Sequence, residues 1–179
     1  MLGEKLRDKR TQQNLSLRQL ADQTDLTPSF LSQVERNLAS PSITSLRRIS
    51  AALGVPIFYF LLEDETGKQI VRRQERKSLN FPESLLTFEL LSPGLSHKME
   101  VIMARLQPGH ATCDRQLSHT GEECVVVLEG AMDIQIGDET HHLEAGDSIY
   151  YLSSLPHRIV STHKEKDLVF LSAITPPNF

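Results

Sequence analysis

Three side chains in the second half of the chain have the types and the spacing of metal ligands. His119 and Glu123 lie four residues apart, and His157 follows Pro156 in a later turn. Two imidazoles and one carboxylate, carried by different strands, can hold zinc, iron, manganese or nickel. The plain alternative is that each of the three only lines a polar pocket, and the sequence leaves both interpretations open.

The same residues also suit a pocket for a small organic molecule. Arg115 and Tyr150 could receive a carboxylate, whereas the carboxyl groups nearby would favour an amine. Alternation along a strand places Glu123 on the opposite face from Glu122, so we expect Glu123 to point inward. No second acid–base pair or nucleophile arrangement accompanies these groups, which disfavours an enzyme. The expected pocket consists of Arg115, His119, Glu123, Tyr150 and His157.

A second group of polar side chains lies at helical spacing in the first half. Ser29, Ser32, Gln33 and Arg36 stand at positions i, i+3, i+4 and i+7, which share one face of a helix. A face that meets only solvent is usually rich in lysine and glutamate. Short hydroxyls, an amide and an arginine instead approach base edges and phosphates closely, which favours DNA as a partner.

Five short helices are expected to carry this face within the first 62 residues. Ser16 and Thr27 supply capping hydroxyls, Pro28 occupies a first helical turn and Gly54 ends a helix. Apolar positions recur at helical spacing in each segment. The expected segments are an opening helix that Asn14 ends, Ser16–Thr24, Thr27–Arg36, Ile43–Leu53 and a short helix that Pro56 opens.

Beyond residue 62 the hydrophobic pattern changes from helical to alternating. Residues 63–77 are polar and charged, which is typical of a linker. Met132, Ile134 and Ile136 alternate with smaller or polar residues, as in a half-buried strand, and residues 125–128 read as a continuous apolar strand. Turn signals recur about every ten residues, which predicts an antiparallel sandwich or barrel.

The formal net charge of −4 is distributed unevenly along the 179 residues. Residues 1–62 carry +3 and residues 63–179 carry −7, and all seven histidines fall in the second part. The total alone would argue against nucleic acid, but its distribution fits a basic DNA-binding unit joined to an acidic unit. Because +3 is modest, we expect weak DNA binding by one copy and a dimer built through the second part.

The chain shows no segment that would place it in a membrane. Its apolar runs fall short of the roughly 20 residues that cross a bilayer, and its N-terminus lacks the apolar core of a signal peptide. We therefore expect a cytoplasmic protein. Cys113 and Cys124 are too few for a disulfide framework and are expected to be free thiols.

The first third of the chain, residues 2–61, resembles the XRE (Cro/CI-like) family of helix-turn-helix domains. The resemblance rests on GEKLR at 3–7, LSLRQLA at 15–21, FLSQVER at 30–36, SPS at 40–42 and LGV at 53–55. It implies a helix-turn-helix motif at 17–36, whose recognition helix, Thr27 to Arg36, lies in the major groove. It places the DNA contacts at Arg18, Thr27, Pro28, Ser29, Phe30, Ser32, Gln33 and Arg36.

The same resemblance gives these contacts their roles. Gln33 would read a base, because a glutamine side chain can bond to adenine N6 and N7 together. Ser29 and Ser32 would read bases or position the helix, and Phe30 would touch a thymine methyl group. The two arginines would hold phosphates.

Two positions depart from the XRE pattern. Leu17 stands where the family usually has a glutamine that buttresses the recognition helix. Asn37 stands where a turn usually has glycine, but asparagine tolerates the left-handed conformation. Arg10 and Glu35 resemble the family's structural ion pair, and we expect them to serve the scaffold rather than DNA.

Residues 109–161 resemble the cupin β-barrel, with a first motif at 109–130 and a second at 146–157. A cupin that holds metal typically uses two histidines two residues apart, then a glutamate and a last histidine. The matching positions here are Leu117, His119, Glu123 and His157. Because a leucine cannot ligate a metal, the resemblance leaves both a three-ligand divalent metal site and an organic-ligand pocket open.

The whole chain resembles XRE regulators with a C-terminal cupin sensor, of the putrescine-utilisation repressor type. This resemblance implies an α + β two-domain protein: a helix-turn-helix domain at 1–62, a linker at 63–77, and a cupin sensor and dimerisation domain at 78–179. The expected function is a homodimeric transcriptional regulator, a repressor rather than an activator. It would bind an inverted-repeat operator in double-stranded DNA and respond to a small metabolite such as an amine or an amino acid. A metal-dependent cupin enzyme tethered to DNA is the alternative, and an antitoxin-type DNA-binding partner is a third.

Overall fold

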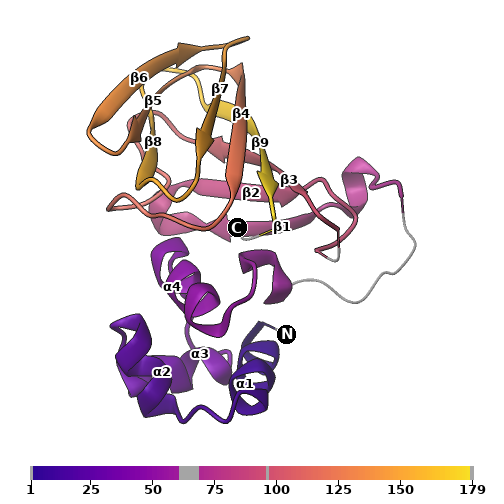
Figure 1. Ribbon diagram of the computed structural model, residues 1–179, viewed down its shortest axis with the longest axis vertical. Helices are drawn as coiled ribbons and strands as arrows, with labels where there is room; N and C mark the ends of the chain where they lie inside the picture. The colour runs from indigo at the N-terminus through magenta and orange to yellow at the C-terminus, as the bar shows by residue number, and fades with distance from the viewer. Residues whose placement is uncertain (1, 61–68, 96, 178–179) are drawn as a thin grey trace. The chain divides into compact units, whose positions relative to one another are not determined.

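The chain divides into two compact units, Met1–Glu63 and Asp64–Phe179 (Figure 1). A computed structural model describes residues 2–60, 69–95 and 97–177. The predicted linker at 63–77 lies partly outside these residues. Its described part holds a 3-10 turn, η2 (Arg73–Glu75), and the first residue of strand β1.

The described residues of the first unit, 2–60, contain four α-helices, not the five expected. The predicted fifth helix is a single 3-10 turn, η1 (Ile57–Phe60), in which the N–H of Tyr59 bonds to the carbonyl of Pro56 at 3.0 Å. This tight turn buries three of its four side chains, those of Ile57, Phe58 and Phe60. The four helices are α1 (Leu2–Gln12), α2 (Leu17–Thr24), α3 (Pro28–Glu35) and α4 (Ile43–Leu53).

The sequence signals for the helix ends of this unit are confirmed. Ser16 and Gln19 form a capping box at the start of α2, and Thr27 accepts a bond from the N–H of Phe30 at 3.1 Å at the start of α3. Asn37 adopts the left-handed conformation with φ of 56°. Its side-chain oxygen accepts a bond from the N–H of Gly3, which ties the turn after α3 to α1.

Arg10 and Glu35 form a two-bond ion pair inside this unit, as the scaffold interpretation predicts. The Arg10 Nε lies 2.6 Å from Glu35 Oε1, and a second guanidinium nitrogen lies 3.0 Å from Oε2. Arg10 also donates to the carbonyl of Leu15. The hydrogen bond to Glu35 raises the pKa of Arg10 above its ordinary value, and the two bonds hold α1 against α3.

Replacing Glu35 by glutamine should lower the free energy of unfolding by about 3 kcal/mol, because a nearly buried guanidinium loses its counter-charge. Urea unfolding of the full chain measures this change. The matched control is Asp25→Asn, which removes the exposed partner of Arg48 at 3.4 Å and should cost less than about 0.5 kcal/mol. Equal losses in the two variants would contradict the structural role of the buried pair.

The second unit is an antiparallel sandwich of two sheets (Figure 1). One sheet has six strands in the order β1-β2-β3-β9-β4-β7, and the other has three in the order β6-β5-β8. The strands are β1 (Lys77–Phe81), β2 (Leu86–Leu90), β3 (Glu100–Leu106), β4 (Glu122–Glu129), β5 (Ala131–Ile136), β6 (Glu139–Glu144), β7 (Ser148–Leu152), β8 (His157–Ser161) and β9 (Leu168–Thr175).

The prediction of a closed barrel was wrong. Among the described residues, the strands form two separate sheets that do not join into a continuous ring. Strand β7 pairs only with β4, and β6 pairs only with β5. Buried apolar side chains of both sheets, such as Val125 and Ile134, form the core, as in other sandwiches. The expected strand at 125–128 and the alternating strand after it are confirmed as parts of β4 and β5.

The inner face of the six-stranded sheet carries a buried carboxylate, that of Glu123. Glu123 of β4 lies opposite Ile174 of β9 on one side and opposite Tyr151 of β7 on the other. All three are buried, as the alternation of β4 predicts for Glu123.

Cys113 and Cys124 are free thiols, as expected. No helix among the described residues is long and apolar enough to span a membrane.

Candidate metal centre and DNA interface

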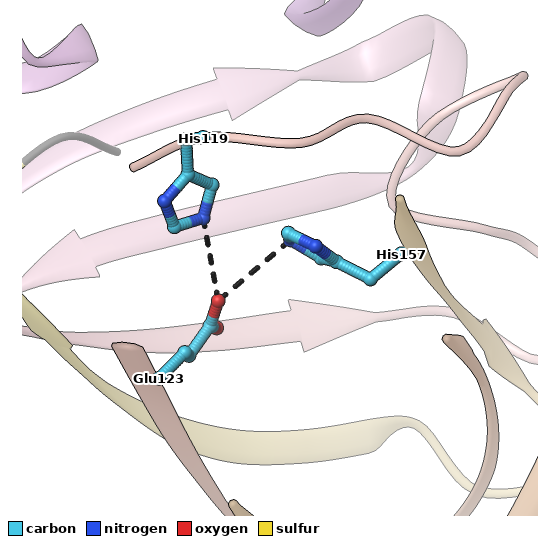
Figure 2. Close-up of side chains that lie close together, drawn as sticks. All are labelled: His119, Glu123 and His157. Carbon is cyan, nitrogen blue, oxygen red and sulfur yellow. Dashed lines mark ion pairs between the residues drawn. The ribbon is translucent and has the colours of Figure 1, made fainter. Parts of the chain in front are cut away.

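His119, Glu123 and His157 come together inside the second unit (Figure 2). His119 lies in the loop before β4, Glu123 on β4 and His157 at the first position of β8. The Nε2 atoms of His119 and His157 lie 3.4 and 3.7 Å from Glu123 Oε2. One donor atom from each residue falls within 4.8 Å of the other two. Sequence spacing thus singled out three groups that the fold brings to one point.

Backbone carbonyls fix the orientation of both imidazoles. The Nδ1 of His157 lies 2.9 Å from the carbonyl oxygen of Leu155, and the Nδ1 of His119 lies 3.3 Å from that of Thr120. A proton on each Nδ1 leaves the lone pair on Nε2, the atom that faces Glu123. This is the tautomer in which a histidine ligates a metal through Nε2.

Glu123 is held by Ser172, a residue of β9 that sequence reasoning missed. The Ser172 hydroxyl donates to Glu123 Oε1 and leaves Oε2 facing the two imidazoles. Burial raises the pKa of the Glu123 carboxyl, but hydrogen bonding to the His119 imidazole and the Ser172 hydroxyl and electrostatic attraction to the two imidazoles outweigh burial and leave that pKa below its ordinary value. The carboxyl group is therefore an anion at neutral pH.

The donor set fits a first-row divalent metal. His119 Nε2 and Glu123 Oε2 are buried and have no hydrogen-bond partner, which is costly unless another group completes them. Ligand atoms about 2.1 Å from one metal lie about 3.0–3.5 Å from each other. The two separations from Glu123 Oε2, 3.4 and 3.7 Å, are at or slightly above this range, and the donor atoms of the two histidines lie within 4.8 Å of each other.

Gly121 lets the loop that carries His119 pass close to the end of β9. Its φ is +104°, and a Cβ at this position would overlap the carbonyl oxygen of Thr175. Only glycine combines this conformation with this close approach. The backbone at Gly121 therefore helps to place His119 and Glu123, which lie on either side of it.

Two members of the expected pocket do not join this cluster. Tyr150 is 63% exposed and donates its hydroxyl to Glu122, on the opposite face of the sheet. Its neighbour Tyr151 is the one that points inward, with its ring centroid 5.1 Å from that of His157. Arg115 is exposed in the loop before His119. The interior is therefore lined by imidazole, carboxylate and tyrosine groups from three of the five expected positions and from Tyr151.

Leu117 stands beside His157, at the place where the cupin resemblance would put another histidine. The two residues exchange backbone N–H to carbonyl bonds of 3.0 and 2.9 Å across an isolated bridge. Directly opposed residues of an antiparallel pair project their side chains to the same face. An apolar side chain thus occupies the position next to the three donors.

The polar face expected on the recognition helix is present on α3. Ser29, Gln33 and Arg36 are exposed and Ser32 is half-buried, while Leu31 and Val34 on the other side are buried. The guanidinium of Arg36 also donates to the carbonyl of Ser32 at 3.2 Å. The exposed side chains at the start and middle of α3 are thus available to a partner.

The remaining expected DNA contacts lie around the start of α3 and on α2. Thr27 and Pro28 are exposed, and the Thr27 hydroxyl is already engaged in capping. Arg18 is exposed in the first turn of α2. Phe30, expected to touch a thymine methyl group, is half-buried, which leaves only part of its ring for that contact.

The first unit has a helix pair whose second helix exposes a polar face, and the second is a sandwich with three potential metal-ligating side chains inside. This combination defines a class of protein, a helix-turn-helix regulator with a cupin domain. Residues 6–60 match the helix-turn-helix family, and residues 102–174 match the cupin domain family. The regulator PuuR of Escherichia coli (strain K12) is 31% identical over 180 residues, covering 99% of this chain and 96% of PuuR. The chain belongs to this family of HTH-type transcriptional regulators.

A second regulator and two solved structures extend the comparison. The HTH-type regulator SutR of Escherichia coli (strain K12) is 26% identical, covering 98% of this chain and 95% of SutR. A structure of an HTH_3 family transcriptional regulator from Vibrio cholerae has a TM-score of 0.76 at 24% identity, with 97% and 94% of the two chains covered. The FeII HppE structure has a TM-score of 0.53 at 21% identity over 97% of each chain, which shows a shared fold.

Proposed function

We propose that the chain is a homodimeric repressor whose cupin unit senses a divalent metal and, through it, a small metabolite. Residues 1–62 form the DNA-binding domain, 63–77 the linker and 78–179 the sensor and dimerisation domain. The observation that carries the sensor part is the convergence of three donor atoms within 4.8 Å in the interior. The protein acts in the cytoplasm, where operator DNA and metabolites are both available.

The DNA-binding part is supported by the surface of α3. A short helix that is capped by a threonine and exposes serine, glutamine and arginine suits the major groove, where its N-terminal residues would meet base edges. The recognition helix of one copy reaches only a few base pairs, and its unit carries a net charge of only +3. Two copies on two half-sites multiply specificity, and a dimer bound to its operator blocks polymerase without further contacts.

The sensor part is supported by the ligand set at the metal centre. His119, Glu123 and His157 would hold the metal, and three protein ligands leave coordination positions that oxygen or nitrogen donors of a metabolite can fill. Tyr151 and the buried carboxylate supply hydrogen-bonding groups beside it. To change repression, the bound effector must favour one dimer geometry over another.

A metal-dependent enzyme tethered to DNA is the weaker alternative. The regulators that match nearly the whole chain, PuuR and SutR, support a regulator rather than an enzyme. The likeness to HppE is one of fold at 21% identity.

The proposal is tested by footprinting and gel shift of the full chain on its own upstream region, with and without chelator and with Mn²⁺, Fe²⁺, Co²⁺, Ni²⁺ or Zn²⁺ added. We expect a protected inverted repeat and an operator affinity that changes at least tenfold with one metal or with a metabolite added to it. Protection of a single half-site would contradict the dimer. An operator affinity that no metal and no metabolite changes would contradict the sensor.

A further inference from the structure

A short basic segment lies at the start of the second unit, just before strand β1. Residues 72–77 carry four basic side chains and one acidic one, whereas residues 78–179 carry six basic and fourteen acidic side chains. The four basic residues are Arg72, Arg73, Arg76 and Lys77. We call residues 72–77 the basic segment. Its positive charge contrasts with the acidic remainder of the unit and lies on the side nearest in sequence to the helical unit.

The fold holds the basic segment in a defined conformation. Its centre is the 3-10 turn η2, in which the N–H of Glu75 donates to the carbonyl of Arg72 at 2.8 Å. The guanidinium of Arg76 lies 3.0 Å from the carboxylate of Glu89 on β2, and Lys77 is the first residue of β1. Because the backbone of the segment is already ordered, a partner that binds there meets a small loss of conformational freedom.

Three of the four basic side chains are available to a partner. Arg72, Arg73 and Lys77 are exposed, and no ion pair between described residues engages their charged groups. Arg105, by contrast, pairs with Asp167 at 3.4 Å. Exposed cations on an ordered backbone suit an anionic partner. A guanidinium suits phosphate oxygens in particular, because its planar fork can donate two hydrogen bonds at once.

We propose that Arg72, Arg73 and Lys77 bind backbone phosphates of the DNA that the first unit reads. This inference rests on the proposed function, in which α3 lies in the major groove. Phosphate contacts contribute affinity and register but carry no sequence information. The basic segment therefore adds to the affinity for any DNA, whereas base reading stays with α3.

The length of the connection keeps the basic segment within reach of the same duplex. Twelve peptide units join Phe60, at the end of η1, to Arg72. A chain of this length spans at most about 40 Å in any conformation. Once α3 is bound, the segment is confined near a polyanion that carries one charge per about 1.7 Å of its axis. This confinement raises the effective concentration of phosphate around the segment and favours DNA over a separate acidic partner.

The charge of the rest of the chain leaves a role for such a contact. Residues 1–62 carry a net charge of only +3, and the basic segment has the same net charge within six residues. The acidic residues 78–179 are repelled by phosphates, so attraction at the basic segment offsets the repulsion where the second unit comes closest in sequence to bound DNA.

The test compares the full-length wild type with the double variant Arg72→Gln, Arg73→Gln on operator and on unrelated DNA. Both side chains are exposed, so urea unfolding of the variant should match that of the wild type. At about 0.1 M salt we expect the affinity for both DNAs to fall at least tenfold and by the same factor. The slope of log affinity against log salt concentration should decrease by about two for each bound copy. Ethylation interference should reveal phosphates that the wild type requires and the variant does not.

The matched control is Lys164→Gln with Lys166→Gln, which removes two exposed positive charges from the loop before β9 of the same unit. Its affinities and salt slope should equal those of the wild type. An equal loss in the control would show an effect of net charge alone and overturn the contact. An arginine variant that binds DNA with the wild-type affinity and slope would overturn it as well. A wild type that binds no DNA would instead overturn the proposed function.

Discussion

Replacing Gln33 and Ser29 together by alanine should reduce affinity for the operator at least about 100-fold. Each well-placed side-chain contact to a base edge contributes about 1–3 kcal/mol of discrimination. Both side chains are exposed on α3, and neither forms a hydrogen bond or ion pair with other described residues that its loss would break. Binding to unrelated DNA should change little, because phosphates carry most of that affinity.

Quantitative gel shifts on operator and on unrelated DNA, at several salt concentrations, measure this effect. Gln12→Ala is the matched control, since it removes an exposed glutamine from the end of α1 and should leave both affinities unchanged. Arg18→Ala should weaken binding to both DNAs equally. It should also reduce the slope of log affinity against log salt concentration by about one. Unchanged operator affinity in the double variant would overturn α3 as the recognition helix.

The helix-turn-helix unit could be predicted closely because its signals are local. Capping residues such as Ser16 and Thr27 act within three residues along the chain, so sequence alone places the starts of α2 and α3. The left-handed turn at Asn37 has an equally local cause. The prediction of an α-helix after Pro56 was wrong. Phe58 and Phe60 are buried in a 3-10 turn there, and their burial depends on tertiary contacts that neighbouring residues in the sequence do not reveal.

The cupin unit was less predictable because its site depends on register between distant strands. The motif spacing brought out His119, Glu123 and His157, but it could not show that Ser172, some 49 residues after Glu123, would hold its carboxylate. The choice between Tyr150 and Tyr151 also depends on register. Counting the alternation of β7 from its pairing with β4, rather than from the sequence alone, would have selected Tyr151.

Replacing Glu123 by glutamine should weaken binding of a divalent transition metal at least about 100-fold. The amide keeps the volume of the side chain but removes the anion that faces both imidazoles at 3.4 and 3.7 Å. His157→Ala should have a similar effect, because it removes one of three donors. Ser172→Ala should cost only about tenfold, since a group that orients a ligand contributes less than the ligand itself.

Titration calorimetry with chelator competition on the full chain measures these affinities. His110→Ala is the matched control, because this histidine bonds to the carbonyl of Pro108 and lies outside the cluster. Its metal affinity should equal that of the wild type. Wild-type affinity in Glu123→Gln would show that the metal, if bound, lies elsewhere in the chain.

Leu117→His should change metal affinity in the opposite direction, raising it about tenfold or more. Its backbone is paired with His157 by bonds of 3.0 and 2.9 Å, so a new imidazole would project to the face that already carries three donors. The same substitution fills a coordination position that a metabolite would otherwise use. We therefore expect the variant to hold metal more tightly and to respond less to the metabolite, whereas an organic-ligand pocket without metal would show neither change.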